Sequence, residues 1–100
     1  MLHLLSLHYT APERAAEPFI RGHIAYLERH HRDGTFLVSG QTVPTSIGGV
    51  IIAHGVDRPT IEHITAQDPF VLKNVAKYTI TTITPGRVHP ALSSVLTPNS

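Results

Sequence analysis

The chain of 100 residues contains no cysteine, and this absence excludes several classes of protein. Without thiols it cannot hold a disulfide framework, a thiolate metal site, a redox CxxC pair or a cysteine nucleophile. Long hydrophobic runs are absent as well, since no stretch of apolar residues exceeds five, whereas a membrane-spanning helix needs about twenty. Residues 1–7 also lack the basic start of a signal peptide. We therefore expect a cytoplasmic protein with no membrane partner.

A large excess of charge of either sign is also missing. Eight Lys and Arg face seven Asp and Glu, which gives a net charge of +1. This count cannot build the basic face that phosphate binding requires, so nucleic acid is not an expected partner. The 41% of hydrophobic residues supply one compact core for a chain of this length. We expect a single domain over residues 1–100, with a core in about residues 2–84 and an extended tail in residues 85–100.

What the sequence does contain is an alternation of short strands with two helices. Residues 19–32 carry apolar and aromatic side chains at helical spacing, and Pro18 weakens the turn before them. Asp57 and Pro59 begin a second helix, which ends before Pro69 because a residue that precedes proline leaves the α region. A loop is expected at residues 40–46 and a short turn or helical segment at residues 70–76. The predicted strands are residues 2–9, 35–39, 48–53 and 77–84.

This order, βαββαβ, is typical of the ferredoxin-like fold of the α+β class. Right-handed crossovers place both helices on one face of a four-stranded antiparallel sheet. The strand residues 36–38 and 50–52 are apolar at consecutive positions, so both faces of the sheet are expected to be hydrophobic. A homodimer whose two sheets pack face to face would cover the helix-free face. The expected partner is therefore a second copy of the chain.

Histidine is unusually frequent, with eight copies, and His23 is the one placed for chemistry. It shares a helical stripe with Phe19 and Tyr26 that should face the sheet. An imidazole there is either a core histidine with satisfied hydrogen bonds or a base in a pocket. Asp68 lies where the second helix ends and could approach His23; a carboxylate bonded to one ring nitrogen makes the other more basic. Asp68-Pro69 is equally a common start for a helical turn.

The remaining histidines do not favour a metal site. His23 and His30 are seven residues apart, about 10 Å along a helix, so they cannot bind one ion together. His30 and His31 are expected to be solvated at the helix end, near the negative end of its dipole. His30 and Asp33 are the one pair considered whose spacing along the helix would let two side chains bind the same metal ion. We expect no metal, and surface or interface positions for His3, His8, His54, His63 and His89.

Serine and glycine patterns indicate no second reaction. Ser39 lies outside any GxSxG nucleophile elbow. Gly48-Gly49 belongs to neither a GxGxxG nor a Walker phosphate loop. Paired glycines at this position are more typical of a close backbone approach at a hairpin or at the mouth of a pocket.

An ordered set of short motifs resembles the YciI-like (YCII-related) family over about residues 2–90. The set comprises His23-Ile24-Ala25-Tyr26-Leu27, Gly34, Ser39-Gly40, Pro44, Gly48-Gly49, Asp68-Pro69-Phe70 and Tyr78. Each motif alone is common, but their order within one chain of this length is fairly specific. The resemblance implies a dimeric α+β barrel built of ferredoxin-like subunits, in agreement with the two hydrophobic sheet faces. It also implies that the family's His-Asp active-site pair falls on His23 and Asp68.

The activity that this resemblance implies most readily is dehydrochlorination of a chlorinated, hydroxylated aromatic compound. Related dimeric barrels include muconolactone isomerase-like, haem-handling and monooxygenase-like proteins, so fold analogy leaves the reaction open. The chain departs from the family at Gln41, often proline, and at Lys73-Asn74, usually Ala-Gly. Asn74 should preserve the turn because asparagine tolerates left-handed backbone. Lys73 should add a cation near Asp68 and alter which anions the pocket accepts.

These inferences predict a small homodimeric enzyme that moves a proton, by elimination or isomerisation, on a small polar or hydroxylated cyclic substrate without a cofactor. His23 and Asp68 are the predicted catalytic residues. Tyr26, Ser39 and Phe70 are the predicted substrate-binding residues, although Tyr26 and Ser39 also fit structural roles. The alternative is a non-catalytic ligand-binding or accessory protein in which the His-Asp pair is structural. A catalytic pair must face an open pocket, whereas a structural pair should be sealed.

Overall fold

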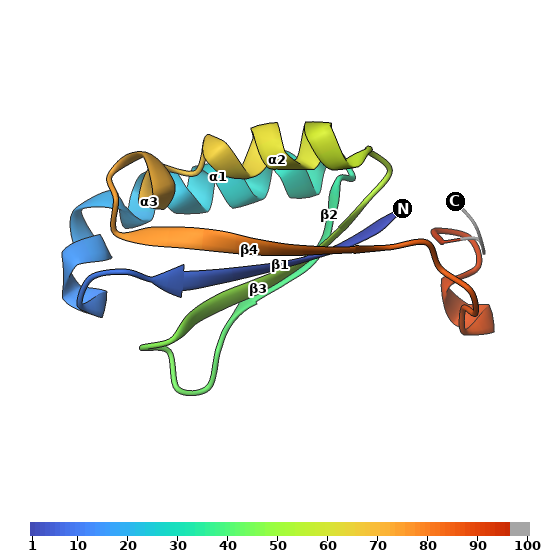
Figure 1. Ribbon diagram of the computed structural model, residues 1–100, viewed down its shortest axis with the longest axis horizontal. Helices are drawn as coiled ribbons and strands as arrows, with labels where there is room; N and C mark the ends of the chain where they lie inside the picture. The colour runs from blue at the N-terminus through green and yellow to red at the C-terminus, as the bar shows by residue number, and fades with distance from the viewer. Residues whose placement is uncertain (97–100) are drawn as a thin grey trace.

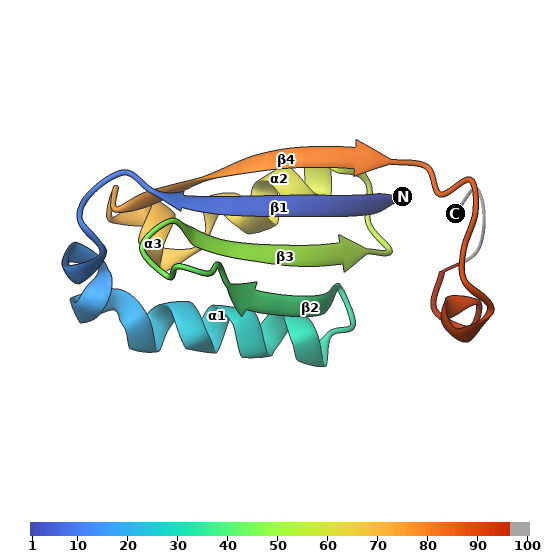
Figure 2. The ribbon, with the colours of Figure 1, turned by 90° about the horizontal axis from the view of Figure 1, so that it is seen from below.

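The computed structural model describes residues 1–96 and contains one four-stranded antiparallel sheet. The strand order is β2-β3-β1-β4, which places β1 and β3 in the centre (Figure 2). Each neighbouring pair is antiparallel. The strands are β1 (Leu2–Tyr9), β2 (Phe36–Gln41), β3 (Gly48–His54) and β4 (Ala76–Ile83).

Three α-helices lie on the same side of this sheet, and the opposite face carries none of the described helices (Figure 1). They are α1 (Ile20–Arg32), α2 (Arg58–Ala66) and α3 (Pro69–Leu72), with 3₁₀ segments η1 (Glu13–Phe19) and η2 (Pro90–Leu92). The arrangement is the ferredoxin-like α+β fold predicted from the sequence, so that prediction is confirmed. No helix within residues 1–96 has both the length and the apolar character to cross a bilayer.

Local chemistry sets the helix boundaries. Pro18 lies in η1, and regular α1 starts two residues later, as expected for a proline that disturbs the first turn. Asp57 caps α2 by accepting a 2.9 Å hydrogen bond from the backbone N–H of Thr60. The chain leaves α1 through Gly34, whose φ is +80°, and turns into β4 through Asn74, whose φ is +58°. The left-handed conformation expected at Asn74 is confirmed.

A register shift in β2 decides which of its side chains face the helices. Phe36 pairs with Ala53 and Val38 pairs with Ile52, so an extra residue is accommodated between them. Phe36 is therefore buried under the helices while Val38 is 59% exposed on the other face. Without this bulge, strict alternation would turn Ser39 away from the helix side. The strand also continues through Gln41, so the predicted loop at residues 40–46 begins two residues too early.

The start of β3 requires glycine. Gly48 has φ +149°, and a Cβ built on it would lie 1.8 Å from the carbonyl oxygen of Leu7 on β1. Any side chain there would push the two central strands apart. The sequence interpretation of these glycines as a close backbone approach is confirmed at this position.

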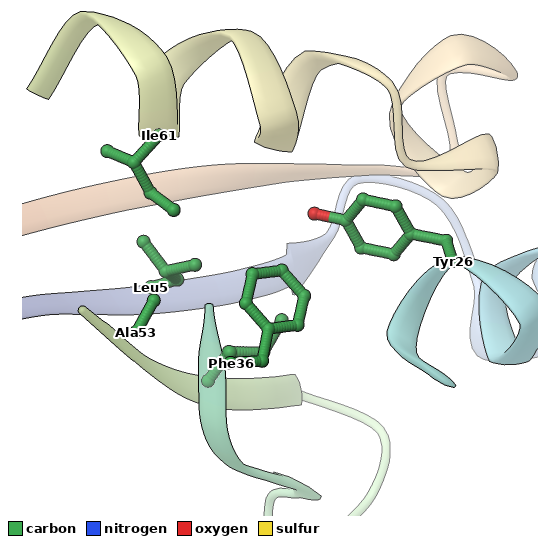
Figure 3. Close-up of a cluster of buried hydrophobic side chains, with 6 residues drawn as sticks. Leu5, Tyr26, Phe36, Ala53 and Ile61 are labelled. Carbon is green, nitrogen blue, oxygen red and sulfur yellow. The ribbon is translucent and has the colours of Figure 1, made fainter. Parts of the chain in front are cut away.

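The core consists of two clusters between the sheet and the helices. One contains Leu5, Tyr26, Phe36, Ile51, Ala53 and Ile61, and Figure 3 shows most of these side chains converging from α1, α2 and three strands. The other contains Leu7, Ala16, Phe70, Val75 and Ala76. The second cluster lies where η1 and α3 meet the sheet, next to the site described below.

Two histidine positions differ from the expectation. His3 is fully buried, with Nδ1 2.8 Å from the Thr82 hydroxyl oxygen and Nε2 2.8 Å from the carbonyl oxygen of Val56. His30 is 6% exposed and packs with its ring centroid 5.0 Å from that of Phe36. His3 was expected at a surface or interface position, and His30 was expected to be solvated at the helix end. Alternation along β1 and the helical stripe of α1 turn these two rings inward, whatever their polarity.

The helix-free face of the sheet exposes several large apolar side chains. They are Leu4 (39% exposed), Val38 (59%), Val50 (40%) and Ile83 (44%). The prediction that both sheet faces are hydrophobic is therefore confirmed, while the homodimer inferred from it stays a prediction. The chain beyond β4 extends away from the sheet (Figure 1) and forms the short turn η2, so the predicted extended tail is not uniformly extended. Its last four residues, 97–100, lie outside the described residues.

Candidate active site

The close approach of α1 to α3 places His23 beside Asp68. A Cβ built on Gly22 would lie 3.1 Å from Cγ of Pro69, so glycine at this position lets the two helices come together. Pro69 is the first residue of α3, and Asp68 is its N-cap. The next residue of α1 is His23, which therefore faces the cap. Asp68 therefore has both of the roles considered from the sequence: it caps a helix and it pairs with His23.

Asp68 is fully buried, and both of its carboxylate oxygens are occupied by donors. His23 Nδ1 lies 2.9 Å from Oδ1 and 3.0 Å from Oδ2. The backbone N–H of Phe70 donates to Oδ1 at 2.9 Å, and the Tyr78 hydroxyl donates to Oδ2 at 2.6 Å. A buried charge is costly unless it is paired and hydrogen-bonded, and here it has three donors. An ionised carboxylate only accepts, so Nδ1 carries a proton, and in the neutral imidazole Nε2 then holds the lone pair.

Phe70 fixes the plane of the imidazole. The His23 and Phe70 rings are stacked, with centroids 4.0 Å apart and an angle of 7° between their planes. Two contacts at right angles to each other, the carboxylate at the ring edge and the phenyl at its face, therefore hold His23 in one orientation. This preorganisation is what a base needs if its free nitrogen is to meet a substrate.

Burial keeps the neighbouring phenols protonated. It raises the pKa of Tyr78, and the Tyr26 phenol and the Asp68 carboxylate raise it further. The pKa of Tyr9 is raised first by burial and then by the charges of Glu13 and Asp68. Tyr78 therefore remains a hydrogen-bond donor to Asp68, and Tyr9 remains an available donor, across the neutral pH range.

His23 opens onto a cavity of about 530 Å³ between η1, α1 and the ends of β1, β2 and β3. This volume is within the range of small-molecule sites. The His23 side chain is 14% exposed, although Asp68 behind it is sealed. The apolar wall comprises Leu7, Ala16, Ile20, Ile24, Leu27, Val50, Ile51 and Phe70, and the polar lining comprises Tyr9, Glu13, Glu17, His23, Ser39 and Gln41.

The structure brings together four of the five residues selected from the sequence. His23, Asp68 and Phe70 are in contact, and Ser39 lines the same cavity from β2. Ser39 also lies 2.8 Å from Nε2 of His31. Tyr26 does not line the cavity; it is 7% exposed in the core, with its hydroxyl directed into the interior (Figure 3).

Other cavity residues escaped the sequence analysis. Tyr9 ends β1 beside Phe70, with the two ring centroids 6.1 Å apart. Glu13 and Glu17 line the cavity from η1 and belong to none of the motifs that the sequence analysis selected. Alternation along β4 could have placed Tyr78 on the helix side, but nothing in the sequence joins it to Asp68. Lys73, expected near the pocket, extends over the Phe19 ring at 5.9 Å and does not line the cavity.

No metal centre is assembled in the part of the chain that the structure describes. Within residues 1–96, no three His, Asp or Glu side chains are grouped as ion ligands. The polar chemistry at the cavity is instead that of one imidazole, two free carboxylates, one phenol, one hydroxyl and one amide.

Comparisons with known proteins agree with this architecture. Residues 1–84 match the model of the YCII-related domain. Among solved structures, one similar chain is 5-chloro-2-hydroxyhydroquinone dehydrochlorinase from Burkholderia phenoliruptrix AC1100, in complex with 2,5-dihydroxybenzoquinone. The TM-score is 0.69 at 18% sequence identity, and the match covers 86% of this chain and 96% of the other. A search of the curated proteins found no match to this sequence.

Proposed function

The chain belongs to the YCII-related family, and we propose that it is an acid–base enzyme in which His23, oriented by Asp68, moves a proton on a small hydroxylated cyclic substrate. The observation that carries this proposal is the half-open pair: Asp68 is sealed, whereas His23 borders a cavity of about 530 Å³. A purely structural pair would have no reason to leave its imidazole at a cavity. The proposed reaction uses only side chains of the protein and needs no cofactor.

The chemistry follows from the tautomer. Nε2 accepts a proton from the substrate while Nδ1–H stays hydrogen-bonded to Asp68. The carboxylate then stabilises the imidazolium that forms, without itself taking the proton. In an elimination, the electron pair released by proton removal expels a leaving group such as chloride. In an isomerisation, the imidazolium returns the proton to a different substrate atom.

The similar solved structure supports elimination as the first reaction to test. That protein is a dehydrochlorinase of a chlorinated hydroxyhydroquinone, in complex with a dihydroxybenzoquinone. An apolar cavity with one phenol, one hydroxyl and one amide in its lining suits a ring of that kind, because Phe70 and the aliphatic wall contact the ring and the polar groups contact its oxygens.

A homodimer through the helix-free sheet face is the second part of this proposal. Leu4, Val38, Val50 and Ile83 are exposed there and would be covered by a second sheet. Analytical ultracentrifugation checks it: we expect a dimer for the wild type and a shift toward monomer for Val38→Glu, a change on the sheet face outside the cavity lining. A wild-type monomer at micromolar concentration would contradict the dimer and leave the proposed chemistry standing.

The catalytic proposal is tested with Asp68→Asn, which retains a helix-capping side chain but removes the charge. We expect ¹⁵N NMR to show the Nδ1–H tautomer of His23 in the wild type and its loss in the variant. Chloride release from chlorinated hydroxyhydroquinones should fall by about a hundred- to ten-thousandfold. Asp57→Asn, the same change at the cap of α2, serves as the control and should keep full activity. If His23 responds to no ring ligand in the cavity, the pair is structural and the protein is a binding or accessory protein.

A further inference from the structure

The charges around the cavity are all of one sign. Glu13 and Glu17 line it from η1, and no Lys or Arg lines it. Arg14 and Arg21, which are close to them in sequence, are exposed and lie outside the lining. His23 does not offset these charges, because Asp68 behind it already balances the imidazolium form.

The two carboxylates at the cavity are also unneutralised. Neither the Glu13 nor the Glu17 side chain makes a salt bridge or side-chain hydrogen bond within residues 1–96. Elsewhere the chain does pair such groups, since Arg58 Nε donates to Glu62 Oε1 at 2.8 Å. The charge of Glu13 reaches the cavity interior, because it contributes to the raised pKa of the Tyr9 phenol. Two free anionic groups therefore act on anything that enters.

Resting on the proposed function, we infer that the substrate class of this site is an uncharged or, preferentially, ammonium-bearing ring, and that carboxylate- and phosphate-bearing rings are rejected. The ring lies against Phe70 and the aliphatic wall, its hydroxyl faces His23 and Tyr9, and its cationic substituent faces Glu13 and Glu17. The acidic pair is one wall of the cavity, and its role is to select charge.

The physical basis is Coulombic attraction in a partly buried site. Two carboxylates attract a cation and repel an anion. Both interactions are stronger at the reduced effective dielectric of a protein surface than in bulk water. An anionic substrate would require a cation in the lining. The one that the sequence placed nearby, Lys73, lies over Phe19 instead.

Three para-substituted phenols of similar size but different charge test this inference. Tyramine is cationic, para-ethylphenol is neutral and para-hydroxyphenylacetate is anionic. Their dissociation constants are measured on the wild-type protein at low salt, by following the His23 ring signals in NMR. We expect tyramine to bind about tenfold more tightly than para-ethylphenol, and para-hydroxyphenylacetate about tenfold more weakly. High salt should reduce these differences.

The double variant Glu13→Gln/Glu17→Gln should bring the three affinities to within about threefold of one another. Glu28→Gln removes one carboxylate charge from an exposed position on α1 outside the cavity and should leave the order of the three affinities unchanged. The charge selection is overturned if para-hydroxyphenylacetate binds as tightly as tyramine, or if the order of affinities survives in the double variant. Either result leaves the proposed function standing, because the ring still reaches His23. Failure of all three phenols to perturb His23 in the wild type overturns the proposed function together with this inference.

Discussion

Two histidines on the same stripe of α1, seven residues apart, have opposite environments. His23 is held at its edge by a buried carboxylate and at its face by Phe70, and it borders a cavity. His30 is 6% exposed among the rings of Tyr26 and Phe36, and within residues 1–96 its ring makes no side-chain hydrogen bond. The same helix thus presents one imidazole arranged for proton transfer and one used as an aromatic filler.

The difference lies in what faces each ring. Opposite His23 the chain reverses from α2 into α3, and the cap of α3 supplies a charged oxygen. Opposite His30 stands Phe36 of β2, which offers only an apolar ring. Burial consequently lowers the pKa of His30, with the Arg29 charge adding to the effect and Asp33 opposing it. The position of a residue on the helical stripe determines whether its side chain points inward. The residue that faces it then determines whether an imidazole is paired with a charge or packed against an apolar ring.

Among the variants that test this comparison, Asp68→Ala is expected to have the largest effect on stability. It leaves His23 Nδ1–H, the Phe70 N–H and the Tyr78 hydroxyl without their acceptor in a buried place, so we expect a loss of about 3 kcal/mol in the free energy of unfolding. Urea denaturation measures it. Asp57→Ala removes the exposed cap of α2 and should lower the free energy of unfolding by clearly less. Equal losses for the two variants would mean that Asp68 acts only as a helix cap.

A pair of tyrosine variants gives a smaller difference. Tyr78→Phe removes the 2.6 Å hydrogen bond to Asp68 and should destabilise the fold by about 1–2 kcal/mol. The Tyr26 hydroxyl lies close enough to Tyr78 for each phenol to affect the other's pKa, but it has no hydrogen-bond partner of normal geometry among the described residues. Tyr26→Phe should therefore be neutral or slightly stabilising. Thermal unfolding compares them, and a greater loss for Tyr26→Phe would contradict this assignment.

The smallest effect concerns pH and His30. Because its pKa is lower in the folded than in the unfolded chain, unfolding takes up a proton, and stability falls as the pH drops below the ordinary value of about 6.5. His30→Leu should flatten this acid dependence between pH 7 and 5, measured as the midpoint of urea unfolding. His63→Gln, at an exposed histidine, is the control and should leave the slope unchanged. An unaltered slope in His30→Leu would place the acid sensitivity elsewhere.

Much of the fold could be predicted because local rules and packing agree. Alternation defined β1 from Leu2 to Tyr9, and periodicity defined α1 to within a residue. Proline and aspartate marked the start of α2. The bulge in β2 could not be predicted, because nothing in Phe36-Leu37-Val38 distinguishes an inserted residue from continuous alternation. His3 and His30 were misplaced because polarity was given more weight than the direction of the backbone.

For the candidate site, the sequence supplied the pair and the structure supplied its surroundings. His23 and Asp68 were selected from helix position, chain reversal and family resemblance. Tyr9, Glu13 and Glu17 were missed because they come from β1 and η1, whose approach to α1 is a tertiary property. Tyr26 was selected as a substrate-binding residue because it shares a helical stripe with His23, whereas packing against Phe36 places it in the core.

The sequence by itself determined the order of elements, the sheet-facing stripe of α1 and the capping function of Asp68, because these follow from backbone periodicity and from the chemistry of residues close together in the chain. Only the tertiary structure decided that the cap also holds His23, that a cavity opens on one side of that pair, and that two free carboxylates border it. Those features require contacts between residues far apart in the chain, such as His23 and Asp68, which are 45 positions apart. Such contacts are fixed by packing of the whole chain, and local rules do not encode them.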